Sequence, residues 1–350
     1  MSTTKKPVAT PEMFNAIRSE ASQAYQDAVP EMQPCDMSVR ALNEVANPIL
    51  AYEVFQNEFL NLLVNKIIMQ LIYRKLWNNP LSMFKKGNIG VGTDIEELHS
   101  NPATAQDYDG TATGMSALLT PNKPDSVPAW YRLNRQDKYT VTINDDQLGN
   151  AMLSWANLDG FIGQIVDTLY NGNTIDEFKY TKQLITDAVT ASKLPTVTSV
   201  MPSNEATSKK FQIALRNLSM QFTFPSTTYN PYKTMGGSGT ARTTWSDISD
   251  QIIIIRADVA ANVGVEFLSA AFNISYADYL ARQVIVDSLG TNGKTLAVLA
   301  DVKAFQIWEK LRKFTTFYNA SALNWQYYYH AWDIFSLSPF HNCTAIVTGT

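Results

Sequence analysis

The segment NLDGFIGQIVDTLY, from Asn157 to Tyr170, carries the strongest helix signal in the sequence. Its large apolar side chains recur at steps of three and four, the spacing of one face of an amphipathic helix. Asn157 is of a residue type that caps helix N-termini. We therefore predict a long helix with one buried face, formed by Leu158, Phe161, Ile162, Ile165, Val166, Leu169 and Tyr170.

The helical spacing resumes after the polar triplet at 171–173 and continues to about Val189, before Pro195. Asn-Gly-Asn at 171–173 predicts a kink or a short break, and Pro195 predicts the end of the helical region. Together the two halves predict a helix long enough to act as a backbone for the chain. A further short helix is predicted at 209–220.

The chain before this helix changes character at residue 48. Residues 1–47 are polar and interrupted by prolines, which predicts an arm that takes its order from a surface it lies on. From Ile49 to Leu63 the helical spacing returns, with Pro48 at the first helical position. Alternation between Ile68 and Leu76 then predicts a strand.

Residues 78–148 form the least ordinary part of the sequence. Strand-like spacing at 89–95 and 139–143 flanks a polar segment rich in Pro, Gly and Thr at 100–128. We expect a long two-stranded excursion with an irregular tip. Such an excursion is marginal by itself in water, so we expect it to be stabilised by packing on another subunit.

The C-terminal part predicts a compact unit of helices and strands. Residues 226–246 are rich in Ser, Thr, Gly and Pro, which predicts a flexible loop and a domain boundary. Beyond the loop we predict strands at 251–256, 283–287 and 296–300, helices at 265–272 and 303–312, and two closing strands within 325–347.

Composition excludes several classes of protein. The formal net charge is 28 − 32 = −4, without the basic excess that gripping nucleic acid requires. Cys35 and Cys343 are too few for a disulfide framework and indicate folding in a reducing cytoplasm. The N-terminus does not resemble a signal peptide. The longest aliphatic run, Ile252–Ile255, is too short to span a membrane.

The best motif candidate for chemistry is Gly293-Lys-Thr295, which resembles the end of a phosphate-binding loop. The full pattern requires a glycine at position 288, which is Ser288, and a helix immediately after the loop. Residues 296–300 instead favour a strand, and a tight hairpin turn at 290–293 explains the same residues. We therefore expect no nucleotide site.

The other polar groups do not form a catalytic or metal-binding pattern. The spacing of His99, His330 and His341 does not suit a metal site. The neighbouring acids Asp145 and Asp146 are expected to open a helix, where negative charge is favoured. The aromatic stripe at 325–335 is expected to pack in the core of a strand. We predict no catalytic, cofactor-binding or metal-binding residue.

Charged pairs flank one turn of the predicted excursion. Lys85 and Lys86 follow the buried-type residue Phe84, and Glu96 and Glu97 stand a few residues later. In an isolated chain these charges would belong to a solvated hairpin. If the excursion lies on a neighbour, these five residues become contacts between subunits that set the register of the two chains.

Several motifs occur together in one order between about residue 41 and residue 349. They are Asn78-Asn79-Pro80-Leu81 with Phe84-Lys85-Lys86-Gly87 and Ile95-Glu96-Glu97; Asp145-Asp146 with Ser154-Trp155 and Phe161; Tyr170-Asn171 with Asp176-Glu177 and Tyr180; Arg256-Ala-Asp258 with Ala270-Ala-Phe272-Asn273; and Asn324-Trp325 with Tyr327-Tyr-Tyr-His330, Trp332 and Phe340.

This set of motifs resembles the major capsid proteins of small protein-primed podophages of the Picovirinae type. The resemblance implies an α+β fold of the tailed-phage capsid type, also called the Hong Kong 97 or Johnson fold. The parts it implies are an N-terminal arm with a helix and strand (1–77), an extended loop (78–148), a peripheral domain with a spine helix (149–235), an axial domain (236–324) and closing strands of the peripheral domain (325–350).

The resemblance also implies a function. We expect a subunit that forms hexamers and pentamers of an icosahedral or prolate head around double-stranded DNA, without sequence-specific binding and without contact to a membrane. A scaffolding protein, a portal and assembly in the bacterial host cytoplasm are implied with it. Some relatives carry a C-terminal Ig-like domain that we do not expect here, and we predict no covalent cross-link. The alternatives are an encapsulin-type nanocompartment shell and, less favoured, a soluble enzyme.

Overall fold

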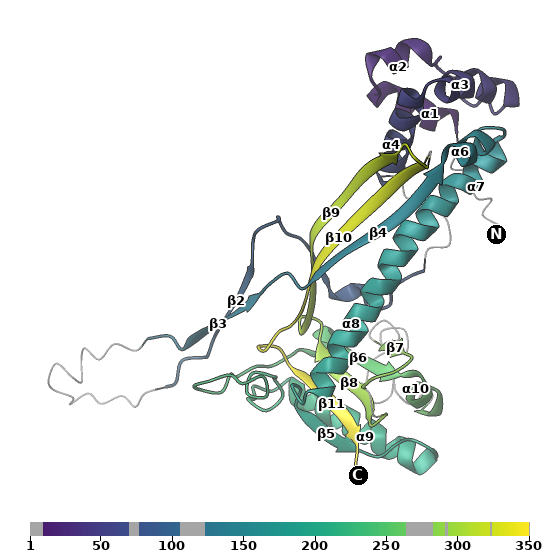
Figure 1. Cartoon of the computed structure of the whole chain (residues 1–350). Coiled ribbons are helices and arrows are strands. Elements are labelled where there is room, and N and C mark those ends of the chain that lie inside the picture. The colour runs from purple at the N-terminus through teal and green to yellow at the C-terminus, as the bar shows by residue number, and fades with distance from the viewer. Residues whose placement is uncertain are drawn as a thin grey trace. The chain divides into compact units, whose positions relative to one another are not determined.

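The computed structural model describes residues 10–69, 77–105, 123–263, 283–290, 293–322 and 324–349 (Figure 1). Helices and strands are mixed along the chain, which agrees with the predicted α+β class. The chain divides into two compact units, and helix α8 and strands β4, β9 and β10 contribute residues to both. Unit 1 comprises Met1–Asn79, Gln136–Glu177 and Leu311–Trp332; unit 2 comprises Pro80–Arg135, Phe178–Lys310 and Asp333–Thr350.

The described part of the predicted N-terminal arm is helical, and its apolar residues join the hydrophobic core of unit 1. The Thr10 hydroxyl caps helix α1 by accepting the Met13 N–H at 3.3 Å. Met13 and Phe14 are buried in the hydrophobic core of unit 1. The polar composition concealed a short amphipathic pattern. The helices are α1 (Pro11–Glu20), α2 (Gln23–Ala28), α3 (Val39–Ala51) and α4 (Glu53–Met69).

The helix predicted to begin at Pro48 is divided in two. Pro48 lies inside α3, where its ring removes one backbone donor, and α3 ends three residues later. Tyr52 has an extended backbone (φ −128°, ψ 121°) and separates α3 from α4. Since α4 continues to Met69, the strand predicted from Ile68 is wrong at its start; its remainder, 70–76, lies outside the described residues.

The long helix is present and has no break (Figure 1). A π-helical turn ends at Asn171 and the backbone stays helical through the polar triplet, so the predicted break is absent. The cap differs from the prediction, because the Asn157 N–H donates to the Ser154 hydroxyl at 3.2 Å. Leu158 is fully buried as predicted. The segments are α7 (Trp155–Val166), η2 (Asp167–Asn171) and α8 (Gly172–Thr190).

The predicted acidic helix start is also confirmed. Helix α6 (Asp145–Ala151) begins with the two neighbouring aspartates, directly after Asn144. The Gln147 side chain accepts the Asn144 N–H at 3.3 Å, which forms half of a capping box.

Unit 2 is built on a five-stranded sheet with strand order β5-β11-β8-β6-β7. Its β6 strand is buried along most of its length, as an uninterrupted aliphatic run predicts for a strand covered on both faces. Ile254 joins one core cluster with Ile185 of α8, and Ile253 joins a second with Phe211 of α9. The elements are β5 (Thr196–Ser199), α9 (Glu205–Phe222), η3 (Ile248–Asp250), β6 (Gln251–Arg256), α10 (Ala257–Val263), β7 (Gln283–Val286), β8 (Thr295–Asp301) and β11 (Cys343–Thr348).

The predicted helix at 303–312 is wrong, because these residues enter strand β9. A short apolar run fits a helix or a strand equally well, and distant pairing decides between them. Strand β1 pairs in parallel with β9, from Lys85 opposite Ile307 to Asn88 opposite Glu309. A four-stranded sheet results with order β1-β9-β10-β4, built from β1 (Lys85–Asn88), β9 (Phe305–Asn319), β10 (Asn324–Leu337) and β4 (Arg135–Asn144).

Two further predictions about the C-terminal part have mixed outcomes. The two closing strands exist as β10 and β11, but they join different sheets. Gly290 and Gly293 have positive φ angles of 73° and 64°, as a turn requires. The turn is not a β-hairpin, since β6 lies between β7 and β8. The helix predicted at 265–272 lies outside the described residues.

Candidate interaction surface

The segment predicted as a two-stranded excursion contains a two-stranded sheet, but with a different partner strand. Strand β2 (Ile95–Ser100) pairs antiparallel with β3 (Ser126–Tyr131), and Figure 1 shows the pair as a separate ribbon. The predicted partner, 139–143, lies in β4 of the four-stranded sheet. Strand β3 was not predicted from the sequence, because Pro128 stands in the middle of the strand and weakens the strand signal.

The turn before β2 replaces most of the strand predicted at 89–95. Gly92 has a φ of 93°, a left-handed conformation that suits glycine and interrupts a strand. Asp94 ends the turn and forms ion pairs with Arg132 at 3.4 Å and with Lys310 at 3.6 Å. The carboxylate of Asp94 therefore connects the turn by ion pairs to the residue that follows β3 and to strand β9.

One face of the β2–β3 sheet packs on the rest of unit 2 through polar side chains. Glu97 bonds to His341 Nε2 at 3.2 Å and accepts the Tyr131 hydroxyl, and the His99 ring stacks on Phe340 at 5.2 Å between centroids. Burial by itself would raise the pKa of Glu97. Hydrogen bonds from His341, Tyr131 and Ser338 outweigh that effect and lower the pKa below its ordinary value of 4.5.

The opposite face of the β2–β3 sheet carries large apolar side chains that the rest of unit 2 leaves exposed. Leu98 is 64% exposed and Trp130 is 58% exposed, and Val91 in the preceding turn is 59% exposed. Glu96 lies opposite Trp130 in the register, so it stands at the edge of the same face. We call Leu98, Trp130 and Glu96 the outer face. The period-two alternation of β2 could have identified Leu98.

The five residues predicted as contacts between subunits lie in different surroundings. Phe84 is fully buried and meets Phe305 edge to face, so it belongs to the chain's own core and is not accessible to another chain. Lys85 pairs with Glu309 at 3.2 Å, and Lys86 donates to the Val302 carbonyl at 3.0 Å. Burial lowers the pKa of Lys86, partly offset by the charge of Asp301. The Glu97 side chain faces the rest of unit 2, and the Glu96 side chain faces solvent.

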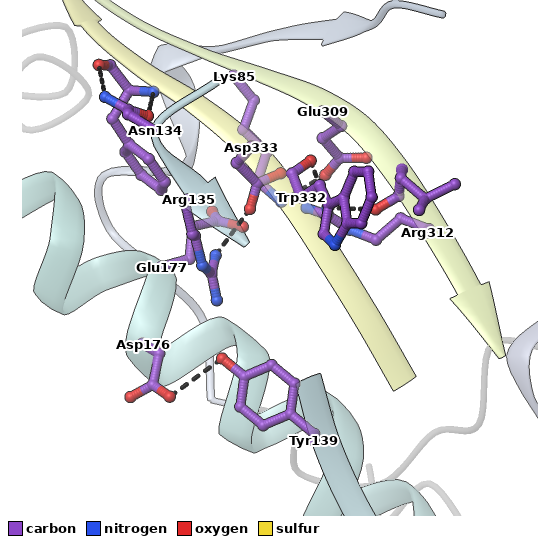
Figure 2. A network of polar contacts seen from close by, with 12 residues as sticks. Lys85, Asn134, Arg135, Tyr139, Asp176, Glu177, Glu309, Arg312, Trp332 and Asp333 are labelled. Atoms are coloured by element: carbon purple, nitrogen blue, oxygen red, sulfur yellow. Dashed lines mark hydrogen bonds and ion pairs between the residues drawn. The ribbon is translucent and has the colours of Figure 1, made fainter. Parts of the chain in front are cut away.

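The end of β3 is anchored by a buried ion pair that sequence reasoning missed (Figure 2). Arg135 Nη1 lies 2.8 Å from Asp333 Oδ2, and their side chains are 2% and 0% exposed. The neighbouring Asn134 side chain donates to the Phe335 carbonyl at 2.8 Å and accepts the Phe335 N–H at 2.9 Å. The chain leaving β3 is thereby fixed to strand β10 of its own unit.

The loop that resembles a phosphate-binding loop, at Gly293–Thr295, is bound by a side chain of the same protein. Strand β8 follows Gly293, so no helix N-terminus faces the loop. The Arg256 guanidinium donates to the Gly293 carbonyl at 2.5 Å and to the Thr295 carbonyl at 3.1 Å. The described part of the loop is therefore followed by a strand and lacks the helix N-terminus that a nucleotide site needs.

His330 has a structural partner within the four-stranded sheet. His330 bonds to the Thr315 hydroxyl at 3.1 Å across β9 and β10. Within the described ranges, no cluster of His, Cys, Asp or Glu could hold a metal ion, and no helix is long and apolar enough to cross a membrane. The aromatic residues Trp325, Tyr327 and Tyr329 are buried in the core of unit 1, as predicted.

Comparisons of sequence place the chain beside phage shell proteins. Residues 14–347 match the sequence model of the family described as Phi29-like phage major capsid protein. The chain is 32% identical over 340 residues to the major capsid protein of Bacillus phage B103, covering 97% of this chain and 73% of that protein. It is 26% identical over 362 residues to that of Streptococcus phage Cp-1, covering 97% and 94%. All four curated relatives that match are named major capsid protein, which gives the nanocompartment alternative no support.

Comparisons of structure give the same fold. The chain is similar to a chain of the Staphylococcus phage Andhra capsid with a TM-score of 0.65 at 14% identity, covering 80% of this chain and 87% of that one. It is also similar to a chain in the structure of head fiber and inner core protein gp22 of bacteriophage P68, with a TM-score of 0.60, 14% identity and the same coverage. The predicted tailed-phage capsid fold is therefore confirmed.

Proposed function

The chain belongs to the family of Phi29-like phage major capsid proteins, and on this premise we propose how its subunits contact one another in the shell. Capsid proteins of this family are structural proteins that assemble into multimeric shells, so the chain is a head subunit of a tailed bacteriophage and not an enzyme. The proposed contact is the outer face of the β2–β3 sheet, laid against a neighbouring copy.

The observation that carries this proposal is the pair of exposed apolar side chains on a two-stranded sheet. Leu98 and Trp130 are each more than half exposed, whereas the other face of the same sheet packs on the rest of unit 2. Large apolar side chains gathered on one face mark interaction sites in soluble proteins. Trp is also enriched among the residues that dominate interface energies.

The charged residues near the outer face fit the edge of a contact. Glu96 is exposed and lies opposite Trp130, so a basic group of a neighbour could pair with it. Lys85 retains partial exposure (37%) beside Glu309. Charges at an interface rim contribute to orientation and rate more than to affinity. We therefore assign register setting to Glu96 and Lys85, and we leave the buried Phe84 out of the contact.

The finer features of the shell form part of the same proposal. The subunit would form hexamers and pentamers, with residues 78–148 as the extended loop, 149–235 and 325–350 as the peripheral domain, and 236–324 as the axial domain. Repeated heterologous contacts that close upon themselves produce rings and shells. A scaffolding protein and a portal would take part in assembly in the host cytoplasm, and the shell would enclose double-stranded DNA without reading its sequence.

The experiment that tests the contact replaces Leu98 and Trp130 by Glu, singly and together. The variants are expressed with the other head proteins of the same phage genome, and shells are quantified by sedimentation and electron microscopy. Ile285→Glu is the matched control, because Ile285 is 51% exposed on β7 of the same unit and away from the β2–β3 sheet.

We expect folded double-variant subunits that yield at least about 10-fold fewer shells, because charges placed in an apolar contact lose their hydration. The control is expected to assemble normally. Normal shell yield from the folded double variant would refute the proposed contact.

A further inference from the structure

The segment that connects β2 to β3 is bound, at the residue directly before β3, by a buried arginine. Arg242 is 1% exposed and comes from the loop at 226–246. Its Nη2 lies 2.8 Å from Asp125 Oδ1, and its Nη1 donates to the Asp125 carbonyl at 2.9 Å. One guanidinium therefore binds both the side chain and the backbone of the residue immediately before β3.

Asn101, the residue immediately after β2, completes the connection. The Asn101 side-chain NH2 group donates to Asp125 Oδ2 at 2.9 Å and to the Ala241 carbonyl at 3.1 Å. The side-chain oxygen Oδ1 accepts the Thr243 N–H at 3.0 Å. The Asn101 backbone N–H also donates to the Asp125 carbonyl at 3.0 Å. Both ends of the segment 101–125 are thus bound to the same short stretch of the 226–246 loop.

The loop that supplies Arg242 is itself held in place. The Asn230 side chain donates to the Arg242 carbonyl at 2.8 Å, and the Arg242 guanidinium lies 5.2 Å from the centre of the Tyr232 ring. Thr244 accepts from Asn230 and pairs through its backbone with Ser226. Because these contacts hold Arg242 independently of Asp125, its guanidinium loses little further conformational freedom when it pairs with Asp125.

Burying an arginine is expensive, and an apolar side chain would stabilise the loop at lower cost. What the ion pair adds is direction, because the two guanidinium donors can donate to a carboxylate and a carbonyl together in one geometry only. The Asp125 side chain is 44% exposed, so water can reach the pair and the connection can open without unfolding the unit. These properties suit a connection that orients a segment rather than one that builds a core.

We propose that Arg242, Asp125 and Asn101 form a latch that holds the β2–β3 sheet in one orientation on its own subunit before assembly. The latch presents the outer face, with Leu98 and Trp130, already positioned for a neighbouring copy. A preformed contact does not pay the ordering cost at the moment of association. This inference rests on the proposed function, since it gives the latch a purpose only if the outer face is a subunit contact.

The test uses the full-length chain with Asn101→Ala and Asp125→Ala, singly and together. Asp258→Ala is the matched control, because Asp258 is similarly exposed (51%) and pairs with Arg256 in the same unit without touching the β2–β3 sheet. Hydrogen exchange of the amides at 95–101 and 125–131 is measured on the unassembled subunit. Shell assembly is then measured against subunit concentration, together with the other head proteins of the phage.

We expect the double variant to exchange at these amides about 10-fold faster or more, with other strands unchanged, since charge-assisted bonds restrain local opening. The concentration needed for assembly is expected to rise about 10-fold, because the ordering cost falls on association. The control should change neither quantity.

Two results would overturn the latch. Unchanged exchange in the double variant would show that the three residues do not restrain the sheet. Faster exchange with unchanged assembly would show that its orientation is irrelevant to association. The Leu98 and Trp130 variants leave the latch intact, so their failure to assemble with normal exchange separates the contact surface from the latch.

Discussion

Arg135 and Asp333 form an ion pair at 2.8 Å in which both side chains are almost completely buried. Arg135 is the first residue of β4, and Asp333 lies in β10, so the pair joins two strands 198 residues apart in sequence. Arg135 also lies 4.9 Å from the centre of the Tyr180 ring of α8. The pair fixes the point at which the chain enters the four-stranded sheet at the start of β4 (Figure 2).

Replacing one partner of this pair is expected to destabilise the subunit. Arg135→Met leaves a buried carboxylate without its cation, which costs about 3–5 kcal/mol in the free energy of unfolding. The double variant Arg135→Met with Asp333→Leu should recover part of that loss, since no isolated charge remains. Denaturant unfolding measures both. Equal destabilisation by the single and the double variant would contradict the role of unpaired charge.

The central strand of unit 2 predicts a second effect on stability. Ile254 in β6 is fully buried in a core cluster, so Ile254→Ala should lower the free energy of unfolding by about 2–5 kcal/mol. Ile285→Ala on the exposed side of β7 removes the same atoms and should cost about 0.5 kcal/mol or less. Similar losses at both positions, measured by denaturant unfolding, would argue against this sheet arrangement.

Glu97 predicts a dependence of stability on pH. Its pKa in the folded chain is lower than its ordinary value of 4.5, so the folded state binds its proton less tightly than the unfolded state does. The resulting stabilisation is present above pH 4.5 and is lost as the pH falls through the folded pKa. Glu97→Gln removes this contribution.

The measurement compares the unfolding free energies of the original chain and Glu97→Gln from pH 7 to pH 3. We expect the original chain to be more stable near neutral pH and the difference to shrink below pH 4.5. A difference that stays constant over this range would show that the Glu97 charge does not contribute.

The sequence predicts elements whose signal is local. The aliphatic run at 251–256 became β6, and the periodic run from Leu158 became α7, in which Leu158, Ile162 and Ile165 are buried. Residues 303–312 were mistaken for a helix because a parallel pairing with β1, more than 200 residues earlier, decides their structure. The latch and the Arg135 pair escaped prediction for the same reason, since no spacing rule connects residue 135 with residue 333 or residue 125 with residue 242.

The candidate surface was predicted only in part. The charged pair at 96–97 lies in β2 of the candidate surface, but β2 alternates, so Glu96 and Glu97 point to opposite faces. Trp130 was not predicted because Pro128 obscured the strand that displays it. A contact surface on a strand is defined by every second residue, and it becomes visible only once the register is known.

The most direct measurement is a high-resolution reconstruction of shells assembled from this chain. The proposed contact predicts that Trp130, 58% exposed in the single subunit, becomes buried against a neighbouring copy together with Leu98. Glu96 should lie within ion-pair distance of a basic side chain of that copy. A shell in which Trp130 and Leu98 both remain open to solvent would contradict the central claim.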